Sequence, residues 1–482
     1  MNKRMTAATL AALTLACVLA SCGDTAETPI ETNAVQTTAE TAANEPSIDY
    51  EGYEFRILNN LSNVAYVNMG ELGQTGETLD DTIYERNMAV ADALNITFKI
   101  ENREYRDTFD TISRVVPAGD DVYDIYTLDL SFMTSHATNG YLMNVLDIES
   151  IDLENPWWNK NAIDSVTIGD YVFSLFGDLH VAYYEAFYPA VFNKQILQEL
   201  DLDDPYQLVL DGTWTLDAML NMMMAAKSNL DGDDKWTTAD RYPFTMYEEN
   251  GSICLLSTSN VFLFEKNEDN IPVWSGLSER FLDTYDKLVK SAFSVKHNNA
   301  LNSSGVVSTS TLEKHRAMMH EGKALFMFEP LGAVKNLRDV DFEIGIVPLP
   351  KYDEAQEEYR TYIFASANAL AIPVTNPDPE RTGTILECMA ELSRNTVRKV
   401  FFDETLDYKY AQDEQAQKML DIMFSNGAFE LGYVYGWGGL VYKAMQCLNA
   451  GKAEIVSPIE KLVATAEADL AATVEAFEAL GN

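Results

Sequence analysis

The chain is poor in basic side chains and in the residue types that most often carry metal and redox chemistry. Its 482 residues contain 34 Lys and Arg against 75 Asp and Glu, a formal net charge of −41, and only five His and five Cys. Binding to nucleic acid depends on basic side chains that neutralise phosphates, so this composition argues against a nucleic-acid partner. The same balance argues against electrostatic docking on an anionic lipid surface.

Signatures of the common hydrolases and ATPases are also missing. The sequence contains no GxSxG, no HExxH and no Walker loop. His315 and His320 are five residues apart, so they do not share a helix face as metal ligands at i and i+4 would. We therefore expect no catalytic residue and no cofactor for catalysis, although 75 acidic residues are too many to exclude a catalytic carboxylate pair by counting.

The five cysteines form neither a disulfide framework nor the spacing of a structural zinc site. Cys17 and Cys22 lie close together near the N-terminus, whereas Cys254, Cys388 and Cys447 are widely separated, and no CxxC pair occurs. Cys388 and Cys447 stand within apolar helical patterns, so we expect them to be buried small hydrophobic residues.

Residues 1–21 predict a secretory signal peptide. Lys3 and Arg4 precede a mostly apolar run over 5–19, which is too short to span a bilayer as a helix. The run ends in Leu-Ala-Ser-Cys, which resembles the lipobox of bacterial lipoproteins and implies that Cys22 carries a lipid and becomes the new N-terminus. Residues 22–51 are rich in Thr, Ala, Glu, Asn and Pro and predict a disordered tether. The alternative is an ordinary secreted protein with a cysteine beside its cleavage site.

The body of the chain begins with an alternation of strand and helix patterns. Apolar residues have period two over 53–57 and again over 96–100, and a helical stripe over 78–94 lies between them. A strand–helix–strand crossover of this length predicts parallel pairing and an α/β fold. Residues 125–128 predict another short strand.

Five segments, in a fixed order, resemble one family of transport proteins. They are Asn155-Pro156-Trp157-Trp158, Val191-Phe192-Asn193-Lys194, Gly212-Thr213-Trp214-Thr215, Glu321-Gly322-Lys323-Ala324-Leu325-Phe326 and Val347-Pro348-Leu349-Pro350. Together with the lipoprotein start they resemble the extracellular solute-binding proteins, family 1, which supply ATP-binding-cassette importers in Gram-positive bacteria. Many members of that family bind sugars and oligosaccharides.

The resemblance implies a two-lobe, periplasmic-binding-protein-like α/β fold of type II, with a ligand cleft between the lobes. The first lobe is expected to take residues 52–187 and 322–395, and the second lobe residues 188–321 and 396–482. The chain is then expected to cross between lobes near 184–189, near Gly322 and near 393–395.

The same resemblance implies a function and its partners. We expect a monomeric protein without enzymatic activity, held by its lipid alone at the extracellular face of the cytoplasmic membrane. It would capture a carbohydrate by closure of the lobes and deliver it to permease subunits. The alternatives are a secreted carbohydrate-active enzyme and a surface module that senses sugar.

Ligand-binding residues are expected among aromatic rings, which pack on sugar faces, and fixed polar groups, which bind hydroxyls. Tyr435 and Trp437 stand in an aromatic, glycine-rich segment over 431–439, and the resemblance implies that this segment lines the cleft. The alternative for Trp437 is a core tryptophan in a glycine-rich turn. Trp158 is a further stacking candidate, although adjacent residues such as Trp157 and Trp158 rarely share a face.

Polar candidates follow the predicted strands and the expected crossing. Open α/β sheets bind ligands at the carboxyl ends of their strands, which predicts ligand contacts for the residues just after each strand. The polar candidates are Asn59, Asn60, Asp129, Tyr184, Glu185 and Glu329.

Residues 229–240 resemble the twelve-residue calcium loop of EF-hands. Oxygen ligands are expected from Asn229, Asp231, Asp233 and Asp240, and from the backbone carbonyl of Lys235. The loop departs from the pattern, since Asn stands at position 1, Asp234 replaces the usual glycine and Asp replaces the bidentate Glu at position 12. We expect a structural calcium ion here, and the alternative is an acidic surface turn.

Overall fold

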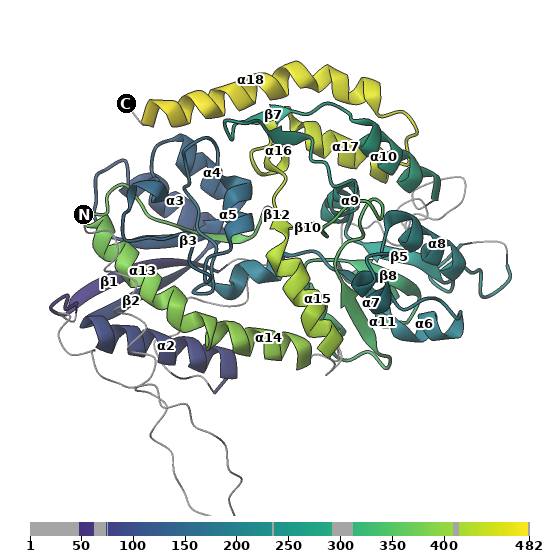
Figure 1. Ribbon diagram of the computed structural model, residues 1–482, viewed down its shortest axis with the longest axis horizontal. Helices are drawn as coiled ribbons and strands as arrows, with labels where there is room; N and C mark the ends of the chain where they lie inside the picture. Colours follow the sequence, from purple (N-terminus) through teal and green to yellow (C-terminus); the bar gives the residue numbers. More distant parts are fainter. Residues whose placement is uncertain are drawn as a thin grey trace, which may run out of the picture.

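The computed structural model describes residues 48–61, 74, 76–233, 236–291, 312–407 and 414–480. The predicted signal peptide, Cys22 and the tether up to residue 47 lie outside these residues, as does Lys235 of the predicted calcium loop. The described chain forms two α/β lobes side by side, each built on its own four-stranded sheet (Figure 1).

Most elements belong to one lobe or the other. Those of the first lobe are β1 (Tyr53–Leu61), α2 (Thr78–Leu94), β2 (Ile96–Glu104), α3 (Tyr105–Val115), β3 (Ile125–Asp129), α4 (Leu130–Thr138), η1 (Val145–Asp147), α5 (Lys160–Val166), β11 (Asn368–Ala371), α13 (Pro379–Arg394) and α14 (Val397–Asp407). Those of the second lobe are β4 (Ala190–Asn193), α6 (Lys194–Glu199), α7 (Pro205–Leu210), α8 (Leu216–Ala226), β5 (Tyr242–Met246), α9 (Glu248–Ser257), β6 (Phe264–Lys266), β7 (Pro272–Trp274), α10 (Glu279–Ser291), α11 (Leu312–His320), β8 (Ala324–Phe328), α12 (Leu331–Val334), η4 (Lys335–Leu337), β9 (Ile344–Val347), α15 (Glu414–Ser425), α16 (Leu431–Val434), η5 (Trp437–Gly439), α17 (Leu440–Asn449) and α18 (Val456–Leu480). The junction holds η2 (Val181–Ala186), β10 (Thr361–Tyr362) and β12 (Gly427–Ala428).

The first sheet has the strand order β11-β3-β1-β2. β1 and β2 pair in parallel, with Tyr53 opposite Ile96, and α2 connects them, so the predicted strand–helix–strand unit is confirmed. Phe55 of β1 and Val90 of α2 are fully buried in the core that this unit shares. β11 joins the edge antiparallel to β3, with Asn368 opposite Asp129.

The second sheet has the strand order β5-β8-β4-β9. Every residue of these four strands is buried, as expected for strands whose two faces are both covered by other elements. β4 runs directly into α6, where the Asn193 side chain accepts hydrogen bonds from the backbone N–H groups of Gln195 and Ile196 and so caps the helix.

The sheet topology corrects the expected lobe boundaries. β8 and β9 pair with β5 and β4, so residues 324–347 belong to the second lobe, and the predicted crossing near Gly322 is wrong. The chain returns to the first lobe after β9, through β10 and into β11. A buried strand made only of apolar residues has the same sequence pattern in either sheet. The pattern of β8 therefore could not show which strands it pairs with.

The remaining crossings lie at the junction drawn in the centre of Figure 1. The first passes through η2 into β4, within a few residues of the range expected from the sequence. α14 packs against α2 of the first lobe and α15 packs against β9 of the second, so the last crossing lies after α14 and not at 393–395. β10 and β12 pair in parallel between the lobes, with Thr361 opposite Gly427.

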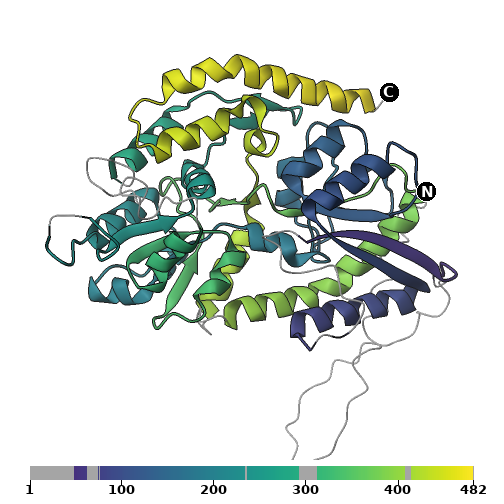
Figure 2. The same cartoon turned by 180° about the vertical axis from the view of Figure 1, so that it is seen from behind.

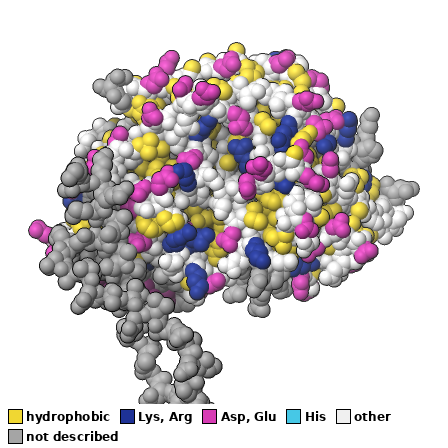
Figure 3. Space-filling view, viewed as in Figure 1, with side chains coloured by type: hydrophobic (Ala, Val, Ile, Leu, Met, Phe, Trp, Pro, Cys, Tyr) yellow, Lys and Arg dark blue, Asp and Glu magenta, His cyan; other side chains and the backbone are white. Residues whose placement is uncertain are grey.

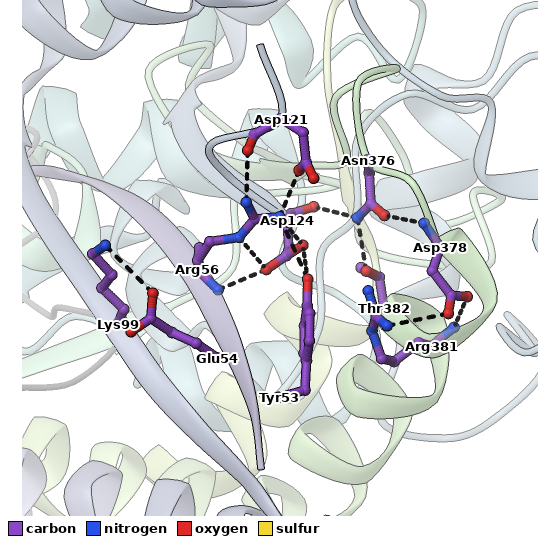
Figure 4. Close-up of polar contacts among 10 residues, drawn as sticks. All are labelled: Tyr53, Glu54, Arg56, Lys99, Asp121, Asp124, Asn376, Asp378, Arg381 and Thr382. Atoms are coloured by element: carbon purple, nitrogen blue, oxygen red, sulfur yellow. Dashed lines mark hydrogen bonds and ion pairs between the residues drawn. The ribbon is translucent and has the colours of Figure 1, made fainter. Parts of the chain in front are cut away.

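A polar cluster fixes the amino ends of β1 and β3 to α13 (Figure 4). Asp124 is fully buried and accepts hydrogen bonds from the Tyr53 hydroxyl (2.6 Å), and from the backbone N–H (2.7 Å) and Nε (3.1 Å) of Arg56. Asn376 donates to the Asp124 carbonyl at 3.0 Å and to Thr382 Oγ1 at 2.7 Å. These contacts join three segments that are far apart in the sequence.

Asp124→Asn is expected to lower the free energy of unfolding by about 2 kcal/mol, because hydrogen bonds to charged groups are worth about 1.5–3 kcal/mol. Chemical denaturation measures the change. Glu54→Gln is the matched control, since the Glu54–Lys99 pair (3.4 Å) is exposed and should contribute less than about 1 kcal/mol. Equal effects of the two changes would contradict a structural role for the Asp124 cluster.

Two histidines are buried in the first lobe. His136 lies between the hydroxyls of Ser113 (3.1 Å) and Tyr126 (2.8 Å), and burial lowers its pKa to about 4. Burial, with the nearby guanidinium of Arg86, lowers the pKa of His180 to about 4 as well. Both rings are therefore neutral in the folded protein at neutral pH.

We expect stability to fall as the pH drops from about 6.5, the ordinary histidine pKa, to about 4. In that window the unfolded chain binds protons that the folded chain does not, and each histidine contributes a slope of about 1.4 kcal/mol per pH unit. Unfolding measured across pH 4–8 tests this, and His136→Gln with His180→Gln should flatten the slope. The control is His320→Gln, at an exposed position of α11. An unchanged slope in the double variant would contradict the assignment.

The surface carries the chain's negative charge. Asp and Glu side chains are spread over the face seen in Figure 3, with Lys and Arg side chains among them. Within the described ranges, no helix combines the length and the apolar character needed to cross a membrane.

Candidate ligand site between the lobes

Three of the predicted polar residues gather at one edge of the first sheet. Asn59 and Asn60 stand near the end of β1 and Asp129 ends β3, and the three side chains are 0–7% exposed. Asn60 Nδ2 donates to Asp129 Oδ1 at 2.9 Å, and Asn368 Nδ2 donates to the Asn60 carbonyl at 3.2 Å. Asn60 Oδ1 is buried and accepts no hydrogen bond from the described residues. The carboxyl edge of the sheet is therefore a cluster of amides and one carboxylate.

Backbone hydrogen bonds connect this edge of the first sheet to the junction with the second lobe. The N–H groups of Leu130 and Ser131 donate to the carbonyls of Ala367 and Ala365, both at 2.9 Å. The next link is Phe364 N–H to the Ala186 carbonyl at 3.0 Å.

The last link reaches the second lobe itself. The N–H of Leu331 donates to the Phe187 carbonyl at 2.8 Å. Asp129, Glu185 and Glu329 are each within two residues of this chain of hydrogen bonds. The three carboxylates, which are far apart in the sequence, thus stand along one path of backbone hydrogen bonds through the junction.

Two of these carboxylates have cationic partners. Arg316 Nε donates to both oxygens of Glu329, at 3.1 and 3.0 Å, and Glu329 is 1% exposed. Lys335 Nζ lies 3.9 Å from Glu185 Oε1, and burial lowers the pKa of this lysine. Such pairing holds the side chains in fixed orientations.

Glu185 also depends on a close approach of the backbone. A Cβ atom at Gly332 would lie 2.8 Å from the Glu185 Cβ, so only glycine fits at this point of α12. η2 and α12 therefore touch directly where the first crossing meets the second lobe.

Tyr188 is a buried tyrosine that directly follows the first crossing. Burial raises the pKa of Tyr188 well above its usual value, and four neighbours raise it further, namely Cys254, Glu329, Tyr433 and Tyr247. Tyr433 and Tyr247 are half-buried, and α16, which carries Tyr433, contacts α4 of the first lobe. The tyrosine cluster therefore lies close to the helix that begins directly after Asp129.

The chemistry of this site suits a ligand rich in hydroxyl groups. Carboxylates and amides accept and donate hydrogen bonds in fixed directions, and tyrosine offers both a ring face and a hydroxyl. A mostly pre-formed site with a small number of placed polar groups is typical of small-molecule recognition.

The structure gives Trp437 a packing role in place of the ligand-stacking role expected from the sequence. The indole is 2% exposed, its Nε1 donates to Thr473 Oγ1 at 3.0 Å, and its ring lies 5.0 Å from that of Phe264. Tyr435 is stacked on it with a ring separation of 5.0 Å and is half-buried. α18 covers the indole, so Trp437 has no open face for a ligand in this conformation.

Trp158 is also held inside the protein. Its Nε1 and that of Trp157 each donate to Glu387 at 2.8 Å, and Asn155 Nδ2 donates to the same carboxylate at 3.0 Å. Trp158 is 4% exposed, which corrects its expected role in stacking on a ligand. Contrary to the expectation that adjacent tryptophans diverge, both indoles converge on one buried carboxylate.

Tyr184 belongs to the packing of the junction. Its hydroxyl donates to Asp178 at 2.9 Å, and its ring lies 4.1 Å from that of Tyr183 and 4.4 Å from that of Phe424. The side chain is 4% exposed and faces this aromatic cluster, whereas the neighbouring Glu185 faces α12.

The predicted calcium loop makes its own hydrogen bonds. Asp240 is fully buried, and its two oxygens accept from the N–H groups of Leu230 (2.9 Å) and Thr237 (2.7 Å). Asn229 Oδ1 accepts from Gly232 N–H at 2.7 Å. No group of three or more acidic, His or Cys side chains within the described ranges is placed to hold a metal. The calcium ion stays a prediction, which melting in calcium and in chelator would check.

The sequence did not single out Arg316, Lys335 or Asn368. The acidic partners of Arg316 and Lys335 are identified only by the fold. The sequence could have indicated Tyr188 as a site candidate, because this residue precedes a proline within the expected crossing near 184–189.

The sequence and the fold were compared with those of known proteins. No family model and no curated protein matches the sequence. Solved structures do match over most of the chain. A cyclo/maltodextrin-binding protein complexed with maltotetraose is 12% identical, with 90% of this chain and 99% of that chain covered and a TM-score of 0.57.

Two further structures are similar to the same extent. The apo form of RafE from Streptococcus pneumoniae is 13% identical, with 89% and 99% of the two chains covered and a TM-score of 0.55. An ABC substrate-binding protein from Listeria monocytogenes in complex with cycloalternan is 12% identical, with 88% and 99% covered and a TM-score of 0.53. Likeness at this identity shows the fold, and the expected two-lobe fold of solute-binding proteins is confirmed.

Proposed function

We propose that this protein is the extracellular solute-binding component of an ATP-binding-cassette importer, with a sugar or oligosaccharide as its ligand. The ligand binds at the junction of the lobes, and the lobes close over it. The closed protein then delivers the ligand to the permease subunits, and no reaction is catalysed.

One observation carries the proposal. Asp129, Glu185 and Glu329 stand within two residues of backbone hydrogen bonds that pass from one lobe to the other, and Tyr188, whose pKa Glu329 raises, adjoins the same bonds. Polar residues near such a crossing can reach one ligand from both lobes. The similar structures include proteins whose bound molecules are maltotetraose and cycloalternan, which supports a carbohydrate as the ligand class.

A melting screen against a panel of mono-, di- and oligosaccharides tests the ligand class. A sugar that binds only the folded protein stabilises it by RT ln(1 + [L]/Kd), or about 2.7 kcal/mol at a hundredfold excess over Kd. We expect at least one sugar to raise the melting temperature without being consumed. Turnover of a sugar would indicate an enzyme instead, and a panel with no effect would contradict the carbohydrate ligand.

The lipid anchor is the second part of the proposal. Leu-Ala-Ser-Cys ends the predicted signal peptide, so Cys22→Ser should leave the protein unprocessed or release it into the medium. Fractionation of cells and medium measures the result. Unchanged membrane retention of the variant would contradict lipidation at Cys22.

A further inference from the structure

The lobes touch at a second place, where the C-terminal helix meets the first lobe. α18 is a 25-residue helix, about 37 Å long, that lies across both lobes in the two opposite views of Figures 1 and 2. It packs on α17 and η5 of the second lobe, with Ala466, Asp469 and Thr473 against η5, and its last turns reach the first lobe beside α4.

Aromatic packing joins the end of α18 to the first lobe. Phe477 is 1% exposed, and its ring lies 4.9 Å from that of Phe173 and 5.9 Å from that of Tyr171. One turn further, a Cβ atom at Gly140 would lie 2.7 Å from Leu480 Cδ2, so the first lobe has a glycine where α18 meets it.

The β6–β7 hairpin makes an additional contact with the first lobe. Gly169 N–H donates to the Asn270 carbonyl at 3.0 Å, and Asn270 Nδ2 donates back to the Gly169 carbonyl at 3.1 Å. Lys266 Nζ also donates to the Asp164 carbonyl. The second lobe thus contacts residues 164–173 of the first lobe through polar groups as well as aromatic rings.

A cavity of about 710 Å³ lies beside these contacts, lined by the hairpin, α5, β12 and residues 356–360. Several polar side chains of its wall already bond within the protein, since Asn161 donates to the Ser425 carbonyl and Arg280 donates to Gln356 at 2.8 Å. These residues of the cavity wall are therefore already held by hydrogen bonds within the protein. The walls of the cavity come from both lobes, so rotation of the lobes must change its volume.

We propose that the β6–β7 hairpin and residues 473–480 of α18 form a clamp, the α18 clamp, which holds the two lobes in one relative orientation. A lobe motion must break or slide these contacts, so the clamp sets the equilibrium between open and closed forms. This inference goes beyond the proposed function, because it concerns the chain without any ligand.

Distance measurements by double electron–electron resonance on ligand-free protein test the clamp. Spin labels at Met88→Cys on α2 and Leu210→Cys on α7 report the separation of the lobes, since both positions are more than 40% exposed. The native Cys254, Cys388 and Cys447 are buried and escape labelling, and Cys17→Ser with Cys22→Ser removes the other two. In protein with an intact clamp we expect one narrow distance distribution.

Asn270→Gly with Phe477→Ala removes the side-chain hydrogen bond and the aromatic contact. The population outside the clamped geometry should rise about tenfold, the shift produced by losing 1.4 kcal/mol of differential stability. A milder pair, Asn270→Gly with Leu480→Ala, opens no core cavity and serves if the first variant fails to fold. Glu475→Ala, at an exposed position of the same helix, is the control and should change nothing.

A distribution that stays narrow and unshifted in a folded clamp variant would overturn the proposal. Because no ligand is present, this result is independent of whether any sugar binds. If no sugar binds but the distance distribution of the clamp variant broadens, the carbohydrate ligand is rejected and the clamp is supported.

Discussion

Trp437→Ala is expected to lower the free energy of unfolding by about 3–5 kcal/mol, the range for truncating a buried aromatic side chain. The indole is 2% exposed between Phe264 and α18, and its N–H has a partner in Thr473. Ligand affinity should change little in the protein that remains folded, since the ring has no open face. Denaturant unfolding measures the first quantity and calorimetric titration the second.

Tyr442→Ala is the control for Trp437, because this aromatic residue of α17 is 48% exposed. Its change in unfolding free energy should stay within about 0.5 kcal/mol. A near-native stability for Trp437→Ala, together with a large loss of affinity, would show that Trp437 contacts the ligand and would contradict its packing role.

Tyr433→Ala is expected to lose about 2–4 kcal/mol of binding free energy, the range of a central contact residue. That is roughly thirtyfold to nearly a thousandfold in affinity for the sugar found by the melting screen. Tyr433 is half-buried, neighbours Tyr188 and stands on α16, which contacts the first lobe at α4. Tyr433 therefore stands on an element of the second lobe that packs against the helix following Asp129.

Tyr433→Phe separates the hydroxyl from the ring. If the ring face carries the contact, this variant should keep most of the affinity, whereas loss in both variants would assign the contact to the hydroxyl. The exposed Tyr442→Ala again serves as the matched control. An unchanged affinity in Tyr433→Ala would remove α16 from the site.

Local patterns were sufficient for the features that depend on local geometry. The alternation over 53–57 and 96–100 predicted the parallel pair β1–β2, because each strand buries one face beside the helix between them. The polar ends of β1, β3 and β8 were predicted by the rule that places ligands at the carboxyl ends of strands. Asn60 and Asp129 are hydrogen-bonded to each other at the end of the first sheet, whereas Glu329 follows β8 of the second sheet.

Distant partners account for what the sequence could not reveal. Trp158 donates to Glu387, which is 229 residues away, and Trp437 is covered by a helix that begins at Val456. Nothing near either tryptophan distinguishes a ring in the core from a ring on a ligand. The sheet that β8 joins could not be predicted either, since its five buried apolar residues fit both sheets equally well.

The most direct test titrates the best sugar from the screen into the Cys22→Ser protein and into the same protein with Asp129→Asn and Glu329→Gln, by isothermal calorimetry. These changes preserve side-chain shape and remove the two carboxylates that come from opposite lobes. The account predicts one sugar bound per chain in the parent protein and affinity lowered at least about tenfold in the variant, a loss of 1.4 kcal/mol. Equal affinities in the two folded proteins would contradict a ligand site at the junction of the lobes.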